Sequence, residues 1–229
     1  MPFEFNEEPR TKNPLNPFLP LPRSFFQRDF LTVARELIGT HLVRDSVVAR
    51  VVEVEAYGAF DDPACHTMHR PSSRAFLEEN PAGTAYVYLN YGMYWLLNVL
   101  AKGGGPGSKD GIILFRALAP VQGLDEIRQR RHACKRDHDL CAGPGKLGLA
   151  FALDKSFHGH DLTEPASGFY LAERAWTSHS VVSDVRVGIS QAADYPWRFL
   201  AADDPHVSVP YGRVKLHQPA SRKRASKKE

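Results

Sequence analysis

The sequence predicts a single mixed α+β domain built on an antiparallel β-sheet, with helices beside the sheet and a β-hairpin that protrudes from it. Segments with strand-like patterning are short and crowd the last third of the chain. Helical patterns occur between the strands without regular alternation. No repeat and no clear linker divides the 229 residues, and their 43% hydrophobic content suits one substantial core.

The first part of the chain is expected to contain an arm, a helix and a strand segment. Residues 1–22 are rich in Pro and Asn and predict an irregular arm. One helix is expected over residues 24–39, because apolar residues recur at helical spacing, Asp29 lies near the start and Gly39 closes the segment. The pattern then becomes strand-like over residues 41–57.

A β-hairpin is expected near the middle of the chain, after a loop over residues 58–80 that is rich in Asp, Pro, His and Ser. Two apolar runs, residues 86–89 and 93–101, are separated by Asn90-Tyr91-Gly92. Asn and Gly both tolerate the positive φ that a tight turn requires. A turn tip faces water, where a large ring gains nothing from its own core, so the presence of Tyr91 needs an explanation.

The remaining elements are expected after a glycine-rich linker that follows residue 101. They are a strand over 111–118, a helix over 123–133, a loop that passes into a helix over 140–153, and short strands over 169–173, 185–190 and 197–202. The domain is therefore expected to span residues 23–212. Residues 213–229 are expected to form a basic, disordered tail.

The charge of the chain is unevenly distributed. The net charge is only +3, yet the tail alone holds seven Lys and Arg residues against one Glu. A second basic cluster over residues 128–136 includes Arg128 and Arg131. A charge run can be simply a solvated surface, but two such clusters also suit a polyanion, and nucleic acid is the expected one. Arg128 and Arg131 are then candidates for contact with a DNA backbone.

The cysteines and the apolar runs bear on the compartment. Cys65, Cys134 and Cys141 are odd in number and form no CxxC pair, which argues against a disulfide framework and for a reducing interior. No apolar run approaches the roughly 18 residues of a membrane helix, and the N-terminus lacks the pattern of an export signal. The expected place is the cytoplasm with chromosomal DNA, or the nucleus in a eukaryote, with no membrane partner.

A pair of carboxylates and a phenol share one face of the strand that ends in VVEVEAY. Side chains alternate along a strand, so Glu53, Glu55 and Tyr57 point away from the apolar residues between them. A loop with His66 follows soon after. Alternating Glu on a solvent face would give the same pattern, and so would an active site at the end of a strand. Spacing alone leaves both interpretations open.

Several motifs in the same order resemble the 3-methyladenine (alkyladenine) DNA glycosylase family, of the vertebrate alkyladenine type and not the helix-hairpin-helix kind. They are EVEAY, a loop with His66, GTAYVYLNYGMYWLLN, LFRAL, LCAGPGKL and DKSF, within residues 24–209. The resemblance implies a monomeric enzyme with no metal or organic cofactor. Its expected partner is double-stranded DNA with damaged purines, namely 3-methyladenine, 7-methylguanine, hypoxanthine or ethenoadenine. It would hydrolyse the N-glycosidic bond and leave an uncut abasic site.

The resemblance also implies roles for individual residues. Glu55 matches the general base that activates water, and Arg116 with the backbone carbonyl of Val187 matches the groups that hold this water. The base pocket and the DNA contacts match a further set: Tyr57, His66, Tyr88 and Asn98 around the flipped base, Tyr91 and Met93 under the DNA, and Lys146 at a phosphate. A stacked purine must be flipped out before attack, and an aromatic wedge such as Tyr91 can fill the space it leaves. Glu53 is expected to be secondary.

Two other classes of function remain open. Metal ligands occur in His66-x-x-His69 and in His132-x-Cys134-x₃-His138-x₂-Cys141, although neither has the spacing of a standard zinc finger. A zinc site there would favour a metal-dependent hydrolase or a zinc-stabilised binding module. A non-catalytic nucleic-acid-binding protein would share the basic clusters but would not need Glu55.

Overall fold

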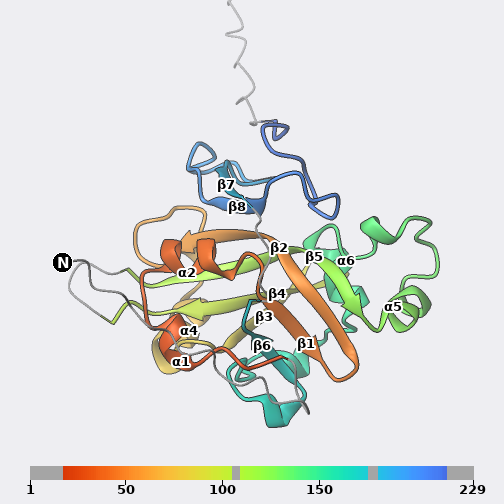
Figure 1. Ribbon diagram of the computed structural model, residues 1–229. Helices are drawn as coiled ribbons and strands as arrows, with labels where there is room; N and C mark the ends of the chain where they lie inside the picture. The colour runs from red at the N-terminus through yellow and green to blue at the C-terminus, as the bar shows by residue number, and fades with distance from the viewer. Residues whose placement is uncertain (1–17, 105–108, 175–179, 216–229) are drawn as a thin grey trace, which may run out of the picture.

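An antiparallel sheet runs through the part of the chain that the computed structural model describes, residues 18–104, 109–174 and 180–215 (Figure 1). Its strands are β1 (His41–Arg44), β2 (Val47–Gly58), β3 (Ala85–Asn90), β4 (Tyr94–Ala101), β5 (Gly111–Gln122), β6 (Phe169–Ala172), β7 (Val181–Asp184) and β8 (Arg198–Ala201). Their order is β3-β4-β5-β2-β1-β6, while β8 pairs with β2 and β7 pairs with β8. Helices flank this sheet, so the predicted α+β class is confirmed.

Strand β2 is the centre of the sheet and has three partners. It pairs with β5 along one side, and on its other side it pairs first with β1 and then, from Glu53 to Glu55, with β8. Neighbouring strands therefore satisfy both edges of its backbone around Glu55. This central place explains why Glu53 and Glu55 have no exposed surface, which rules out the solvent-face interpretation of the two carboxylates.

Two compensating irregularities in the β2–β5 pairing decide which way β2 faces. One extra residue, Val52, lies between the pairs Val51↔Leu118 and Glu53↔Ala117, and one extra residue of β5, Arg116, precedes the pair of Val54. Val51 and Val52 both belong to the main core, so the inward positions change here from odd to even numbers. A bulge redirects side chains in this way. It leaves Glu53 and Glu55 on the face opposite the main core.

The helices cover both faces of the sheet. They are α1 (Arg23–Phe26), α2 (Phe30–Leu37), α3 (His66–His69), α4 (Pro71–Glu79), α5 (Leu124–Arg130) and α6 (Pro144–Ala150), with short 3₁₀ helices η1 (Asp137–Asp139), η2 (Lys155–Phe157) and η3 (Pro165–Ser167). The apolar side of α2 packs on β2 and β5 in the main core, and α6 packs on β4 and β5. Leu77 of α4 joins a smaller apolar cluster with Cys65 and Tyr86.

The single helix predicted over residues 24–39 is wrong, because the structure breaks it into α1 and α2. Asp29 is the reason: its carboxylate accepts from the N–H groups of Leu31 at 3.0 Å and Thr32 at 3.3 Å and so starts a new helix. The same chemistry that placed Asp29 near the start of a helix makes it an N-cap. Gly39, at φ 93°, follows the end of α2 as expected.

The predicted hairpin is formed by β3 and β4, with Asn90 opposite Tyr94. Tyr91 has φ 51°, Gly92 has φ 67°, and the Met93 N–H donates to the Asn90 carbonyl at 3.0 Å. Two central residues with positive φ make this a tight type I′ reversal. Tyr91 is 85% exposed, so its ring does not fold back over the hairpin. A bulky residue in the left-handed region is strained, and here no burial offsets that strain.

Two further segments differ from the sequence-based expectations. The predicted loop 58–80 contains α3 and α4, because Pro71 suits the first position of α4 and Ser73 and Leu77 bury one side of it. The strand expected over 185–190 is absent, and β7 takes its place just before. The Val187 N–H donates to a side chain there instead of a neighbouring strand.

The predicted arm and tail fall largely outside the described residues. Residues 18–22 of the expected arm lie along β6, where Leu21 is buried and its N–H donates to Leu171 at 2.8 Å. Residues 1–17 and the tail from 216 to 229 lie outside the description. None of the described helices has the length and apolar character needed to span a bilayer.

Candidate active site

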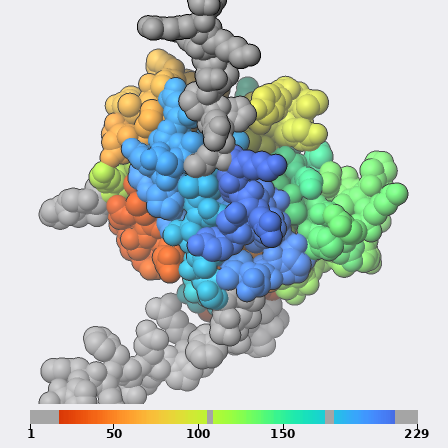
Figure 2. Space-filling model, turned by 90° about the horizontal axis from the view of Figure 1, so that it is seen from above, coloured from red at the N-terminus to blue at the C-terminus, as the bar shows by residue number. Residues whose placement is uncertain are grey.

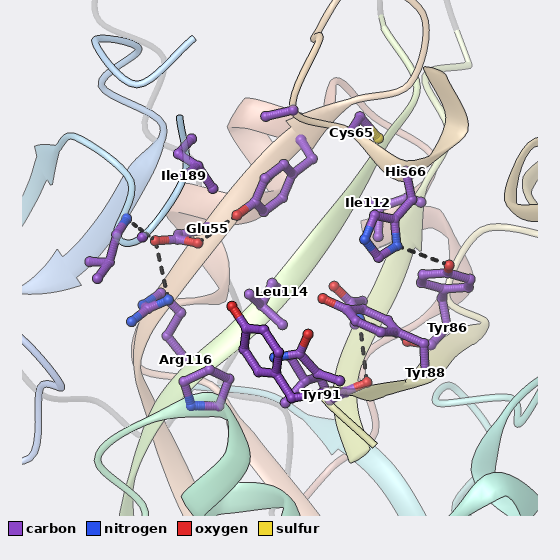
Figure 3. Close-up of a pocket in the computed structure, with 18 residues that line it drawn as sticks. Glu55, Cys65, His66, Tyr86, Tyr88, Tyr91, Ile112, Leu114, Arg116 and Ile189 are labelled. Carbon is purple, nitrogen blue, oxygen red and sulfur yellow. Dashed lines mark hydrogen bonds and ion pairs between the residues drawn. The ribbon is translucent and has the colours of Figure 1, made fainter. Parts of the chain in front are cut away.

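A cavity of about 310 Å³ opens on the sheet face that carries Glu55 (Figure 3). Its lining gathers the expected catalytic and base-pocket residues, and Tyr91 from the hairpin tip joins them. The full lining comprises Glu55, Tyr57, Ala64, Cys65, His66, Tyr86, Tyr88, Asn90, Tyr91, Leu96, Asn98, Ile112, Leu114, Arg116, Pro144, Val187, Gly188 and Ile189. Segments far apart in sequence therefore converge on one cavity.

The floor of this cavity is a row of side chains across four adjacent strands. Register pairs Glu55 with Leu114, Leu114 with Asn98, and Asn98 with Tyr86. Directly paired residues point to the same face of a sheet, and strands lie about 4.8 Å apart. Glu55 and Asn98 are two strands apart, so a planar group roughly 10 Å long could lie between them.

Three donors hold the carboxylate of Glu55 (Figure 3). The Tyr57 hydroxyl donates to Oε2 at 2.7 Å and the Val187 N–H donates to Oε1 at 2.7 Å, while the Arg116 guanidinium lies 3.3 Å from Oε1. Burial and the neighbouring carboxylate raise the pKa of Tyr57 well above its usual value, so its hydroxyl keeps the proton it donates. The N–H of Val187 meets Glu55, whereas its carbonyl was the group expected to contribute.

Glu53 is held by a different set of groups and does not line the cavity. It accepts from Arg116 at 3.0 Å, from Arg198 at 2.9 Å and from the N–H of Ser208 at 2.6 Å. The chain after β7 brings in the last two, and in Figure 2 this blue segment spreads over the middle of one face. The oxygens of Glu53 are thus occupied, which agrees with its expected secondary place.

Arg116 lies between the two buried carboxylates. Burial acts against its charge, but Glu55 and Glu53 together raise the pKa of Arg116 above its ordinary value. Its Nε faces Glu53 and its terminal nitrogen faces Glu55. The permanent positive charge keeps both carboxylates in place on the floor of the cavity.

Aromatic rings form the walls. The imidazole of His66 meets Tyr88 edge-on, with ring centroids 4.6 Å apart, and its Nδ1 lies 3.2 Å from the Tyr86 hydroxyl. Burial, with smaller contributions from Arg70 and His69, lowers the pKa of His66 to about 4, so the ring is neutral near pH 7. Burial raises the pKa of Tyr88 as well, so this wall carries no charge.

Asn98 presents its amide oxygen to the cavity. Its nitrogen donates to the carbonyl of Tyr86 at 2.9 Å and to that of Leu96 at 3.4 Å, and carbonyls can only accept. The side chain is almost completely buried and cannot easily turn. The expected base-pocket residue is therefore fixed by the backbone of the hairpin.

The candidate DNA contacts differ in their surroundings. Tyr91 and Met93 are exposed at the hairpin tip, and Lys146 is exposed two residues after Pro144 at the edge of the cavity. Arg128, by contrast, is bonded to Asp125 at 3.1 Å and to Asp137 at 2.7 Å. Two carboxylates already surround its guanidinium, so it is the weaker candidate for phosphate.

The contacts of Arg131 and of the histidine–cysteine cluster over residues 132–141 support the fold. The Nε of Arg131 donates to the Leu140 carbonyl at 3.2 Å. Cys141 is fully buried, and burial raises its pKa to about 12, which disfavours the thiolate that binds metals. Across residues 18–104, 109–174 and 180–215, no three His, Cys, Asp or Glu side chains gather where a metal ion could be held. The zinc hypotheses are therefore not supported.

Sequence reasoning missed three residues that shape the site. Tyr86 lines the cavity, and its two-residue spacing from Tyr88 on a strand was a usable signal. Arg186 and Arg198 are completely buried and bonded to the carboxylates of Asp62 and Glu53. Arginine is rarely buried, so no pattern in the sequence marks these two.

Comparison with known proteins identifies the family. Residues 24–205 match the family model described as Methylpurine-DNA glycosylase (MPG). A protein of Rhodopseudomonas palustris strain HaA2 is 39% identical over 84% of this chain and 92% of its own length. One from Salinibacter ruber is 39% identical over 82% and 96%, and one from Rubrobacter xylanophilus is 43% identical over 72% and 82%. All three bacterial proteins carry the name 3-methyladenine DNA glycosylase as a provisional assignment.

The family match covers most of the chain and includes every element that lines the cavity. This makes the protein an enzyme, a DNA glycosylase that acts on alkylated bases, with DNA as its substrate. On this evidence the chain belongs to the methylpurine-DNA glycosylase family.

Proposed function

We propose that the enzyme flips an alkylated purine out of duplex DNA into the cavity and hydrolyses its N-glycosidic bond with Glu55 as the general base. One observation carries this proposal. A carboxylate with no exposed surface lies on the floor of an aromatic cavity whose lining also includes an exposed tyrosine at a hairpin tip. An enzyme that flips nucleotides needs three parts together: a pocket for the nucleobase, a general base that activates water, and a wedge that enters the duplex.

The reaction passes through a sugar with oxocarbenium character. Glu55 would take a proton from the attacking water, and its negative charge would stabilise the positive sugar. The three donors around Glu55 fix the carboxylate in advance, so little reorganisation is needed during the reaction. An alkylated purine already carries positive charge and leaves without prior protonation, so a single carboxylate suffices.

The walls suit a cationic base. Tyr57, Tyr88 and a neutral His66 present ring surfaces without a positive charge. A cation over an aromatic face is stabilised by about 0.5–2 kcal/mol, which a neutral normal purine does not gain. The carbonyl-like oxygen of Asn98 adds a fixed acceptor at the far end of the row. We propose that this difference contributes to the preference for alkylated over normal purines.

Tyr91 is proposed to be the wedge that enters the duplex, with Met93 beside it. The hairpin holds the ring away from the core, and stacking between a base and an aromatic ring is worth about 1–3 kcal/mol. That stabilisation offsets part of the few kcal/mol needed to flip a nucleotide. Lys146 and the basic tail would add contacts with phosphates.

The lesion range is proposed to include 3-methyladenine, 7-methylguanine, hypoxanthine and ethenoadenine, as the resemblance to the vertebrate alkyladenine type implies. The relatives compared above are bacterial, so the resemblance to the vertebrate type is taken to concern only the motifs that supply the pocket residues. Action as a monomer is proposed, as the resemblance implies. No metal or organic cofactor is proposed, and the substrate sets the place of action at chromosomal DNA.

A base-release assay tests the proposal. The protein is incubated with duplexes that carry one defined lesion, and with the same duplex undamaged. Release of the free base and appearance of an alkali-labile abasic site are expected only with the lesion. Tight binding to the lesion without any base release would refute the enzymatic proposal and favour a binding protein.

A further inference from the structure

Arg186, like Arg198, has a completely buried side chain, and its neighbours Tyr57 and Val187 line the cavity. Its side chain and that of Asp62 both have no exposed surface. The two form a forked ion pair: one terminal nitrogen of Arg186 bonds to Oδ2 of Asp62 and the other donates to Oδ1 at 3.0 Å. The partners are 124 residues apart in sequence, so the pair joins the loop after β2 to the segment after β7.

The remaining contacts of Arg186 reach the strand that carries Glu55. Its terminal nitrogens donate to the carbonyl of Ala56 at 3.0 Å and to that of Ala192 at 3.2 Å. The guanidinium carbon Cζ lies over the Tyr57 ring, 4.6 Å from its centre. Trp197 lies on the same cation at 5.3 Å. Arg186 thus supports Tyr57 and also holds the backbone between Glu55 and Tyr57.

These contacts link Arg186 to the two uncharged groups that donate hydrogen bonds to the carboxylate of Glu55. One donor is the hydroxyl of Tyr57, whose ring rests on the guanidinium. The other is the N–H of Val187, the residue that follows Arg186 in the chain. A guanidinium locked by Asp62 and two carbonyls therefore fixes the position of each group from behind.

We propose that Arg186 is a positioning residue for the glycosylase reaction: its fork with Asp62 places the Tyr57 hydroxyl and the Val187 N–H on the carboxylate of Glu55. The inference rests on the proposed role of Glu55. Arg186 does not line the cavity, so it acts through these two donors and not on the substrate itself. Binding of the lesion should depend on it little, and the chemical step should depend on it strongly.

Arg186→Lys is the first test, because it keeps the positive charge opposite Asp62. A lysine has one point charge and cannot bond to Asp62, Ala56 and Ala192 at the same time, and it offers no plane to Tyr57. A small displacement of a catalytic group costs on the order of 100-fold in rate. We therefore expect the single-turnover rate of base release to fall by about 100-fold, while the dissociation constant for lesion duplex changes by less than about threefold.

A control separates positioning from general loss of stability. Leu42→Ala leaves a hole in the main core on β1, away from the cavity. Both variants are assayed well below their melting temperatures. The control is expected to melt lower than the wild type yet release base at the wild-type rate.

A second variant decides the question should Arg186→Lys fail to fold. Arg186→Met combined with Asp62→Leu removes both charges together, since an apolar pair of similar volume often restores the stability of a buried ion pair. The same loss of rate with retained lesion binding is expected. Wild-type rates in either folded variant, or an equal loss in Leu42→Ala, would overturn the positioning role. An inactive wild-type enzyme would instead refute the proposed function, and this inference with it.

Discussion

Replacement of Glu55 by Gln removes the proposed general base with the smallest change of shape. The amide oxygen can still accept from the Val187 N–H and remain near Arg116, the two groups now at Oε1. The amide nitrogen then faces Tyr57, whose hydroxyl can accept as well as donate. Arg116 keeps its bond to Glu53 at 3.0 Å, so its charge stays paired. The pocket should therefore remain intact.

The expected effects on stability and rate differ greatly in size. Loss of the charged hydrogen bonds of Glu55 should lower the free energy of unfolding by about 1.5–3 kcal/mol, which a domain of this length tolerates. Loss of a general base costs about 10²–10⁴ in rate, which corresponds to roughly 3–5 kcal/mol of transition-state stabilisation. The lost electrostatic stabilisation of the sugar cation should add to this deficit.

Single-turnover base release with excess enzyme measures the chemical step, and a gel-shift titration with the same duplex measures lesion binding. We expect Glu55→Gln to bind the lesion as the wild type does and to release almost no base. Glu53→Gln is the matched comparison, because Glu53 lies two residues away on the same face but outside the cavity. A Glu55→Gln enzyme that keeps more than about a tenth of the wild-type rate would refute the role of Glu55 as general base.

Further predictions concern the hairpin, metals, pH and the tail. Tyr91→Ala should keep the melting temperature of the wild type, since the ring is exposed. Its rate of base release should fall most on lesions in well-paired duplex and least on lesions in mismatches or single strands, while Tyr91→Phe should be nearly silent. A lower melting temperature with an equal loss of rate on every substrate would contradict the wedge. Base release should persist in EDTA, and stoichiometric zinc whose removal stops turnover would disprove this. His66 binds a proton more readily in the unfolded chain than in the folded one, because its folded pKa is lowered to about 4. The free energy of unfolding should therefore fall as pH drops from about 6.5 to about 4, and urea melts of His66→Gln should lack this part of the slope. Deletion of residues 221–229 should weaken binding to damaged and undamaged duplex alike. The slope of log affinity against log salt concentration should fall by about 0.9 for each lost phosphate contact. Unchanged binding at low and high salt would show that the tail does not bind DNA.

The sequence predicts the sheet and the hairpin well because their signals are local. Alternation over Glu53, Glu55 and Tyr57 survives in β2, and the turn residues around Tyr91 bracket the observed reversal. The shared cavity of Glu55, His66, Tyr88 and Asn98 was anticipated from family motifs. Residue spacing alone could not bring together side chains that four strands and a loop supply.

The remaining features depend on contacts between distant parts of the chain. The segment 185–190 has the composition of a strand, yet a buried ion pair to Asp62 and a bond to Glu55 take its polar groups away from any sheet. The split between α1 and α2 depends on whether Asp29 caps a helix or sits inside one. Tertiary partners decide the first outcome, whereas the second is a local choice between two positions for Asp29 that propensity does not settle.

The paired bulges in β2 and β5 restrict how the family can lose or gain residues here. Deletion of Val52 alone would restore strict alternation in β2 and keep Glu55 on the cavity face, but it would leave the extra residue of β5 without a matching one in β2. Deletion of Arg116 alone would leave Val52 without a matching extra residue in β5, and it would remove the arginine that holds the two carboxylates. A single length change at either position therefore unbalances the pairing of β2 with β5. Insertions and deletions should accumulate instead in the loops around the cavity, where lesion preference can change while the catalytic strand keeps its length.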